Sequence, residues 1–207
     1  MGKLPERIES KTIFIVEGYD EKGFLNAICN SLNIVDYQVF VVEGNPNFRK
    51  KIPAIFRLPN FQDIVKNIII IRDAELDAFS SIVNILRRQS IIRFELLPQT
   101  PGEFINGTPN IGIFIIPDNV HNGMLEDLCL QTVINNQSHF DCIDDFLQCL
   151  GNYDFQLENR TKVKTQIYMA TQQRLVQTVR DAAAAGIWNL ESPSLDELKL
   201  FLKNIEY

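Results

Sequence analysis

Short hydrophobic runs and helical patterns alternate along the first two thirds of the chain. The apolar runs consist of strand-forming residues and lie at 13–16, 39–42, 68–71 and 111–116, and a further strand is expected from Arg93 to Leu97. Between these runs, apolar residues recur at helical spacing from Asp20 onward and over residues 76–89. Alternating strands and helices are typical of a parallel sheet covered by helices. The sequence therefore predicts an α/β fold.

The pattern changes after Asp118, where the strand signals stop. From Met124 to Tyr207 the hydrophobic spacing is helical. The segment at 45–60, rich in proline and asparagine, predicts a loop. We therefore expect an α/β domain at residues 1–135 and a helical C-terminal extension at residues 136–207 that packs on it.

Composition narrows the class of protein. A chain of 207 residues with 45% hydrophobic and 22% charged residues can bury one sizeable core and is not expected to be disordered. A net charge of −6 argues against binding nucleic acid through general positive charge, but not against an enzyme that meets phosphates through a bound metal. No run approaches the roughly 20 apolar residues of a membrane span, and the N-terminus lacks a signal-peptide pattern, so we expect a cytoplasmic protein without a membrane partner. The four cysteines form no CxxC pair, which favours reduced, mostly buried thiols over disulfides or zinc.

Acidic residues follow three of the predicted strands. Glu17 follows the first strand, Asp73 and Glu75 follow "IIIIR", and Asp118 follows "GIFIIP". The carboxyl ends of parallel strands meet at one sheet edge, and neighbouring strands lie about 4.8 Å apart. Carboxylates that close raise one another's pKa unless a cation lies between them, and a hard ion such as Mg²⁺ suits such a site. The alternative is that each acid only solubilises its own loop.

Two of these motifs carry a resemblance to a known module. "IVEGYDE" and "IIIIRDAE" together resemble the TOPRIM domain of topoisomerases, primases and a group of nucleases that includes the overcoming-lysogenization-defect family. The segments "GIFIIPDNVHNGMLEDLCL", "KVKTQIYMA" and "AAAAGIWNLESPSLDELKLFL" extend the resemblance over nearly the whole chain, to a family of small, uncharacterised TOPRIM-related proteins of bacteria and archaea. The resemblance implies a mostly parallel, TOPRIM-like sheet flanked by helices.

The resemblance also implies roles for individual residues. Glu17 matches the metal-binding glutamate of the module, Asp73 the first aspartate of its DxD motif, and Glu75 stands at the second. Glu21 matches a further acid of the nuclease branch, Leu125-Glu126 its LE motif, and Lys162 a lysine that approaches the reacting phosphate. With Asp118 added from its strand-end position, the expected ligands of Mg²⁺ or Mn²⁺ are Glu17, Glu21, Asp73, Glu75, Asp118 and Glu126, and the expected catalytic residues are Glu17, Asp73 and Lys162.

Simpler interpretations of two of these positions stay open. Glu126 and Asp127 fall in the first turn of a helix, where the helix dipole favours acids in any case. Lys162 lies among Arg160 and Lys164, as on a solvated helix face.

Basic residues gather in "FRKKIPAIFR", which supplies the expected substrate contacts Arg49, Lys50, Lys51 and Arg57 together with Phe48 and Phe56. A second basic cluster contains Arg87, Arg88 and Arg93. Basic and aromatic side chains can hold a nucleic-acid backbone and stack a base, although a solvated loop whose phenylalanines enter the core fits equally.

The sequence thus predicts a Mg²⁺-dependent phosphodiesterase or nuclease-like protein that acts on DNA or RNA. The chain has no P-loop, so the ATPase partner common in TOPRIM nucleases would be a separate protein. The alternative is a non-catalytic TOPRIM relative that binds a nucleotide, nucleic acid or a partner protein.

Overall fold

The computed structural model describes residues 7–75, 77–90, 92, 96–151 and 157–205. Within them, one five-stranded sheet has the order β2-β1-β3-β5-β4. Its parallel strands are β1 (Thr12–Val16), β2 (Tyr37–Val41), β3 (Asn67–Asp73) and β5 (Asn110–Ile116). The short edge strand β4 (Phe104–Ile105) runs antiparallel to β5. The predicted α/β fold with a mostly parallel sheet is confirmed.

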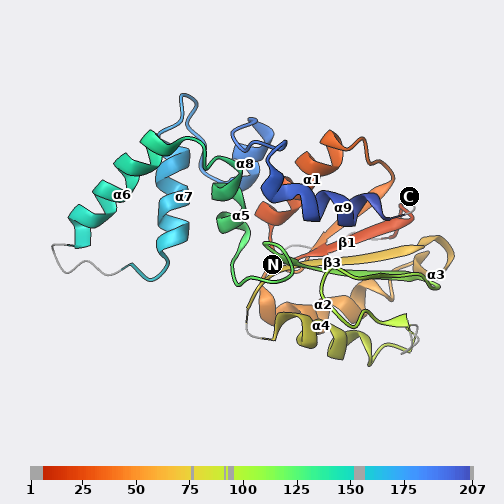
Figure 1. The fold of residues 1–207 in the computed structure, drawn as a ribbon. Helices are drawn as coiled ribbons and strands as arrows, with labels where there is room; N and C mark the ends of the chain where they lie inside the picture. Colours follow the sequence, from red (N-terminus) through yellow and green to blue (C-terminus); the bar gives the residue numbers. More distant parts are fainter. Residues whose placement is uncertain (1–6, 76, 91, 93–95, 152–156, 206–207) are drawn as a thin grey trace.

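Helices cover both faces of this sheet (Figure 1). One face carries α1 (Tyr19–Ser31), α5 (Leu125–Thr132), α8 (Val179–Ala184) and α9 (Asp196–Lys203). The other face carries α2 (Phe48–Ile55), α3 (Phe61–Ile64) and α4 (Ala78–Leu86). The pair α6 (Gln137–Gly151) and α7 (Arg160–Ala170) stands beside α5, away from the sheet, and two short 3-10 turns are η1 (Asn45–Asn47) and η3 (Pro193–Leu195).

Burial on both faces explains why the central strands are apolar throughout. Phe14 of β1 and Ile69 of β3 pack under the helices of the α1 face, whereas Ile13 and Ile68 pack under those of the α2 face. Successive side chains of a strand point to opposite faces, so a strand covered on both sides needs apolar residues at every position. The strand ends are therefore the places in this sheet where polar side chains gather.

The predicted loop at 45–60 was wrong over most of its length, because this segment forms η1 and α2 and ends at Asn60, the residue before α3. Phe48, Ile52 and Ile55 lie on one side of α2 at helical spacing and are fully buried against the sheet. Pro53 lies inside this helix, and Pro46 lies in η1. The prolines indicated a loop, but burial of one apolar helix face outweighs the hydrogen bond that an internal proline removes.

The C-terminal helices share a core with the sheet. The Phe201 ring of α9 lies 5.3 Å from the Phe114 ring of β5, measured between centroids. Residues on both sides of position 135 belong to the same buried cluster. Helices α8 and α9 therefore complete the cover of one sheet face, and the division at 135 stays a prediction.

Three further expectations concern a strand, the cysteines and membrane-spanning helices. Of the strand expected at Arg93–Leu97, residues 93–95 lie outside the described residues, and Leu96 and Leu97 are not in a strand. All four thiols are free, but only Cys29 and Cys129 are buried, whereas Cys142 and Cys149 are exposed. In the described part of the chain, no helix combines the length and apolar character needed to cross a membrane.

Candidate functional site

Strands β1 and β3 bring their acidic ends together. They are parallel neighbours, and the register pairs Val16 with Ile71. Glu17 directly follows β1, and Asp73 is the last residue of β3. Both acids therefore leave the sheet at the same edge, from adjacent strands.

The start of α1 adds a third acid, Glu21. A side chain at Gly18 would place its Cβ 2.7 Å from the Glu21 Oε2 atom, so the glycine leaves room for this carboxylate to fold back over the helix start. Burial raises the pKa of Glu21, as do the charges of Glu17 and Asp20, while the N–H groups of Glu21 and Gly18 oppose the rise. In the pair Glu17-Gly18, the first residue thus supplies one carboxylate and the second leaves room for another, that of Glu21.

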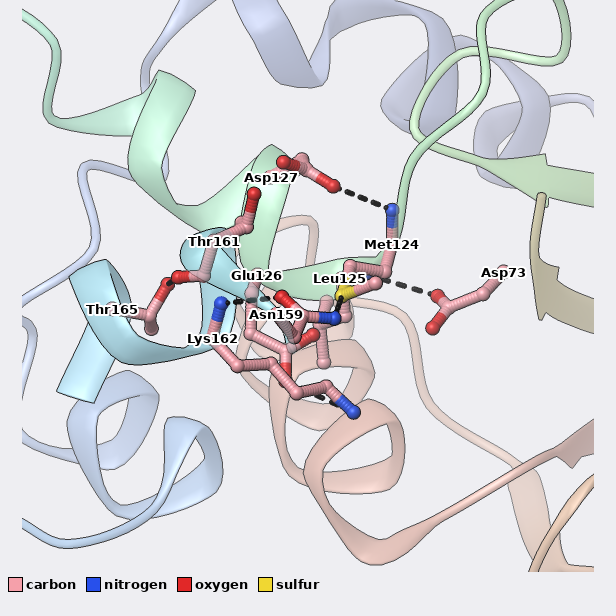
Figure 2. Close-up of polar contacts among 9 residues, drawn as sticks. All are labelled: Asp73, Met124, Leu125, Glu126, Asp127, Asn159, Thr161, Lys162 and Thr165. Carbon is pink, nitrogen blue, oxygen red and sulfur yellow. Dashed lines mark hydrogen bonds and ion pairs between the residues drawn. The ribbon is translucent and has the colours of Figure 1, made fainter. Parts of the chain in front are cut away.

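Asp73 lies at the centre of these charges. Its Oδ1 atom accepts a hydrogen bond of 3.0 Å from the backbone N–H of Leu125 at the start of α5 (Figure 2). Burial, followed by the charges of Glu21, Glu126 and Glu17, raises the pKa of Asp73 from 3.8 to about 8. We call Glu17, Glu21, Asp73 and Glu126 the acidic cluster.

Opposing charges act on Glu17, another member of the acidic cluster. Burial and the charge of Glu75 raise its pKa. Arg72, the backbone N–H of Asn45 and Lys162 act in the opposite direction. The net effect is still a raised pKa, so these cations do not neutralise the site.

Helix α7 brings Lys162 to the acidic cluster. Its Nζ atom lies 3.8 Å from Glu126 Oε1, and Figure 2 shows the two side chains converging from α7 and α5. Asn159 begins α7 by accepting the Lys162 N–H through its side chain at 2.9 Å, and its Nδ2 atom contacts the Met124 sulfur at 3.6 Å. The lysine expected from the resemblance therefore lies beside the acids, although much of the chain separates it from Glu17.

Glu75 has other partners than the acidic cluster. Its Oε2 atom accepts a 2.8 Å bond from Arg72 Nη2 and a second bond from the Asn45 side chain. The Asn45 backbone N–H in turn donates to Glu17 Oε1 at 3.1 Å. These contacts form a chain from Arg72 through Glu75 and Asn45 to Glu17, so Glu75 supports Glu17 through Asn45.

Arg72 and Asn45 were missed by sequence reasoning. Arg72 is only 2% exposed, lies over the Phe48 ring at 5.3 Å, and its Nε and Nη1 atoms find no hydrogen-bond partner among the described residues. The available signal was an arginine inside the otherwise apolar run "IIIIR", because a buried arginine needs a partner for its charge.

The structure does not bring Asp118 to the acidic cluster. Its Oδ1 atom accepts the N–H groups of Val120 and His121 at 3.1 and 2.8 Å, and Oδ2 lies 2.7 Å from His121 Nδ1. Burial acts to raise the pKa of Asp118, but these His121 and Val120 contacts outweigh it and lower the pKa. Asp118 thus follows a strand as expected, but its contacts organise its own loop, and its expected role as a metal ligand stays a prediction.

The predicted basic segment divides in two. Phe48 and Phe56 are 1% and 7% exposed, so they belong to the core and cannot stack a base. Lys51 is also buried, with Nζ 2.8 Å from Glu43 Oε2, which contradicts its expected role in substrate contact. Arg49, Lys50 and Arg57 are exposed, and Arg93 lies outside the described residues.

The acidic cluster fits a divalent cation by its chemistry. All of its donors are carboxylate oxygens, which Mg²⁺ and Mn²⁺ prefer, and the pKa of Asp73 is raised by burial and then by the charges of Glu21, Glu126 and Glu17. Within the ranges that the structure describes, no three His, Cys, Asp or Glu side chains are yet close enough to hold an ion. Binding would therefore draw the carboxylates together and release Glu126 from Lys162.

Comparisons with known proteins give one family, and the similar solved structures include two regions of OLD proteins. The C-terminal region of the Burkholderia pseudomallei OLD protein is 15% identical, with a TM-score of 0.49, over 95% of this chain and 98% of that one. The C-terminal region of the Xanthomonas campestris pv. campestris OLD protein is 16% identical, with a TM-score of 0.38, over 95% and 85% of the two chains. No curated protein matches. A family model described as "Protein of unknown function (DUF3226)" matches residues 11–206, and the chain therefore belongs to this family.

Proposed function

We propose that this protein is a divalent-metal-dependent phosphodiesterase that cleaves nucleic acid, with the acidic cluster as its metal site. The observation that carries the proposal is Asp73, whose pKa is raised to about 8 by burial and by three neighbouring carboxylates. Holding several carboxylates together at a partly buried sheet edge opposes folding unless a cation joins them. The motif resemblance to TOPRIM nucleases points to the same residues.

Each residue has a distinct role in this proposal. Glu17 and Asp73 would hold Mg²⁺ or Mn²⁺, with Glu21 and Glu126 beside them. The bound cation would polarise a phosphoryl oxygen and make water a better nucleophile. Lys162 supplies positive charge where negative charge develops on the phosphate oxygens.

The neighbouring backbone keeps these ligands in place. The Leu125 N–H holds one oxygen of Asp73, and the Asn45 N–H holds one oxygen of Glu17. The Glu75 carboxylate, itself bound by Arg72, accepts a hydrogen bond from the Asn45 side chain. We therefore treat Glu75 as a positioning residue, which differs from its expected role as a metal ligand.

A second candidate is a non-catalytic protein that uses this edge to bind a nucleotide, nucleic acid or a partner protein. The pairing of Glu75 with Arg72 and of Glu126 with Lys162 favours it, because both contacts draw acids away from a shared ion. A separate ATPase or other protein partner is compatible with either candidate.

Cleavage assays on the purified chain separate the two candidates. We expect Mg²⁺- or Mn²⁺-dependent cleavage of labelled DNA or RNA, tested as single and double strands, and its loss in Glu17→Gln. The matched control is Glu191→Gln, which makes the same change at a side chain that is 85% exposed and ion-paired with Lys199. Activity that persists in Glu17→Gln contradicts the proposed site, and metal binding without cleavage of any substrate favours the second candidate.

A further inference from the structure

Helices α2 and α4 enclose a groove on the face of the sheet opposite α1. The two helices lie side by side in Figure 1. The groove has a volume of about 910 Å³, and its polar lining includes Asn45, Arg49, Asp77, Ser81, Asn84 and Arg88. We call it the α2–α4 groove.

Two arginines from separate parts of the chain line this groove. Arg49 comes from α2, and Arg88 follows the end of α4. Both are exposed, and neither has an ion-pair partner in the part of the chain that the structure describes. The fold thus joins one cation from each of the two basic clusters of the sequence.

The groove reaches the acidic cluster through Asn45. This residue lines the groove, and its backbone N–H donates to Glu17 Oε1 at 3.1 Å. Its side chain contacts Glu75, which Arg72 also holds. A ligand lying along the groove would therefore have one end next to Glu17.

We propose that the α2–α4 groove binds the phosphodiester backbone of a single nucleic-acid strand and leads that strand to the acidic cluster. Guanidinium groups pair with phosphate oxygens through fixed, charge-assisted hydrogen bonds. The amides and hydroxyls of Asn84 and Ser81 are typical of further backbone contacts. This inference rests on the proposed function, since it names the substrate that the site receives.

The shape and lining of the groove define the class of strand. Proteins that read a duplex commonly insert a helix or ribbon into its major groove, whereas single-strand binders use a positively charged groove that follows the backbone, as this one would. No aromatic side chain lines the cleft among the described residues, because Phe48 and Phe56 are buried in the core. Binding therefore depends on the backbone and not on base stacking, and little sequence preference is expected.

Asp77 opposes this binding and supplies a second test. Its exposed carboxylate lines the same groove as the two arginines. Replacing it with asparagine removes a negative charge beside the proposed strand, so Asp77→Asn should tighten binding while Arg49→Ala/Arg88→Ala weakens it. A variant that is poorly folded can only lose affinity. Changes in affinity of opposite sign at two positions in one groove therefore show that both positions act by local contact with the strand.

The test is fluorescence anisotropy in EDTA with a labelled oligothymidylate of about 16 nucleotides, near the upper site size of small single-strand-binding domains. Without metal, binding is measured apart from cleavage, so failure here and failure of the proposed catalysis are distinguishable. The matched control is Lys11→Ala/Lys66→Ala, which removes the same charge at exposed positions outside the groove, just before β1 and β3. Thermal melts verify that each variant is folded.

We expect Arg49→Ala/Arg88→Ala to weaken binding about tenfold or more, and the control pair to retain most of the affinity. Loss of two phosphate contacts should also make the slope of log K against log salt shallower by about 1.4. The proposal is overturned if wild type does not bind the oligonucleotide, or if the two double variants lose affinity and salt dependence equally. An unchanged affinity in Arg49→Ala/Arg88→Ala also overturns it.

Discussion

Replacing Asp73 with asparagine should stabilise the metal-free protein at neutral pH. Asparagine keeps an oxygen that accepts the Leu125 N–H at 3.0 Å, and it removes the charge that faces Glu21, Glu126 and Glu17. The pKa of Asp73 is raised by burial and by these carboxylates from 3.8 to about 8. Ionisation of Asp73 is therefore unfavourable in the folded state and not in the unfolded state, so it lowers the stability of the wild type.

The sign and size follow from proton linkage. Below pH 3.8, Asp73 is protonated in both the folded and unfolded states, and its ionisation does not affect stability. Between 3.8 and about 8, the folded state binds more protons than the unfolded state, so stability falls by about 1.4 kcal/mol per pH unit. From 3.8 to about pH 7 this amounts to about 4 kcal/mol, an upper value because the neighbouring carboxylates can move apart. Asp73→Asn should recover about half of this or more.

Urea unfolding in EDTA, at intervals from about pH 4 to about pH 8, measures the effect. The free-energy gain of Asp73→Asn over wild type should be smallest near pH 4 and should grow with pH. Asp118→Asn is the matched control, because the His121 and Val120 contacts overcome the effect of burial and lower the pKa of Asp118. That variant should be destabilised by a nearly constant amount over this range, because the contribution of Asp118 disappears only as pH falls below 3.8.

One result would refute this reasoning. If Asp73→Asn changes stability by the same amount at about pH 4 and about pH 8, Asp73 does not ionise against neighbouring charge. A loss of stability at every pH would show that the carboxylate serves mainly to hold the Leu125 N–H. In either case the acidic cluster would no longer support a cation site.

Two further predictions concern the metal and the lysine. Mg²⁺ or Mn²⁺ at about 100 times its dissociation constant should stabilise the wild type by about 2.7 kcal/mol. In thermal melts, Asp73→Asn should show little of this gain and Asp118→Asn most of it. Equal shifts in all three proteins would place the ion elsewhere. Lys162→Met should reduce the cleavage rate constant about a hundredfold with little change in KM. The control is Lys164→Met, which should remain active because Lys164 pairs with Asp144 at 2.7 Å. Equal losses in both variants would mean that α7 acts only through its general positive charge.

The hydrophobic pattern was sufficient to predict the central strands of the sheet, but not the edge strand β4 or helix α2. The runs at 13–16 and 68–71 become the adjacent strands β1 and β3, because continuous apolar stretches suit strands buried on both faces. Strand β4 is two residues long and has no period to detect. Helix α2 was hidden by Pro46 and Pro53, although its buried residues have helical spacing.

The site was predictable where backbone position decides it. Glu17 and Asp73 leave neighbouring parallel strands, so their proximity follows from the fold. Glu75, Lys51 and Asp118 are instead held by side-chain pairs with Arg72, Glu43 and His121. Arg72 and His121 lie three residues from their partners and Glu43 lies eight residues from Lys51, but a hydrophobic pattern does not record such charge pairs. Strand-end position thus predicts which acids can meet, and the nearest cation decides which of them do.

Charge also relates the acidic cluster to the α2–α4 groove. A phosphate cannot approach Glu17, Asp73 and their neighbours without repulsion unless a cation is already bound there. Arg49 and Arg88 lie on the other side of Asn45, so they can hold a strand before that cation arrives. The two sites are then coupled: a bound strand adds phosphate oxygens near the acids, and a bound cation removes the repulsion between them. Because such coupling is reciprocal, the strand should raise the affinity for the metal by the same factor as the metal raises the affinity for the strand. An overall acidic protein can in this way concentrate its attraction for nucleic acid at one groove and one metal-dependent edge.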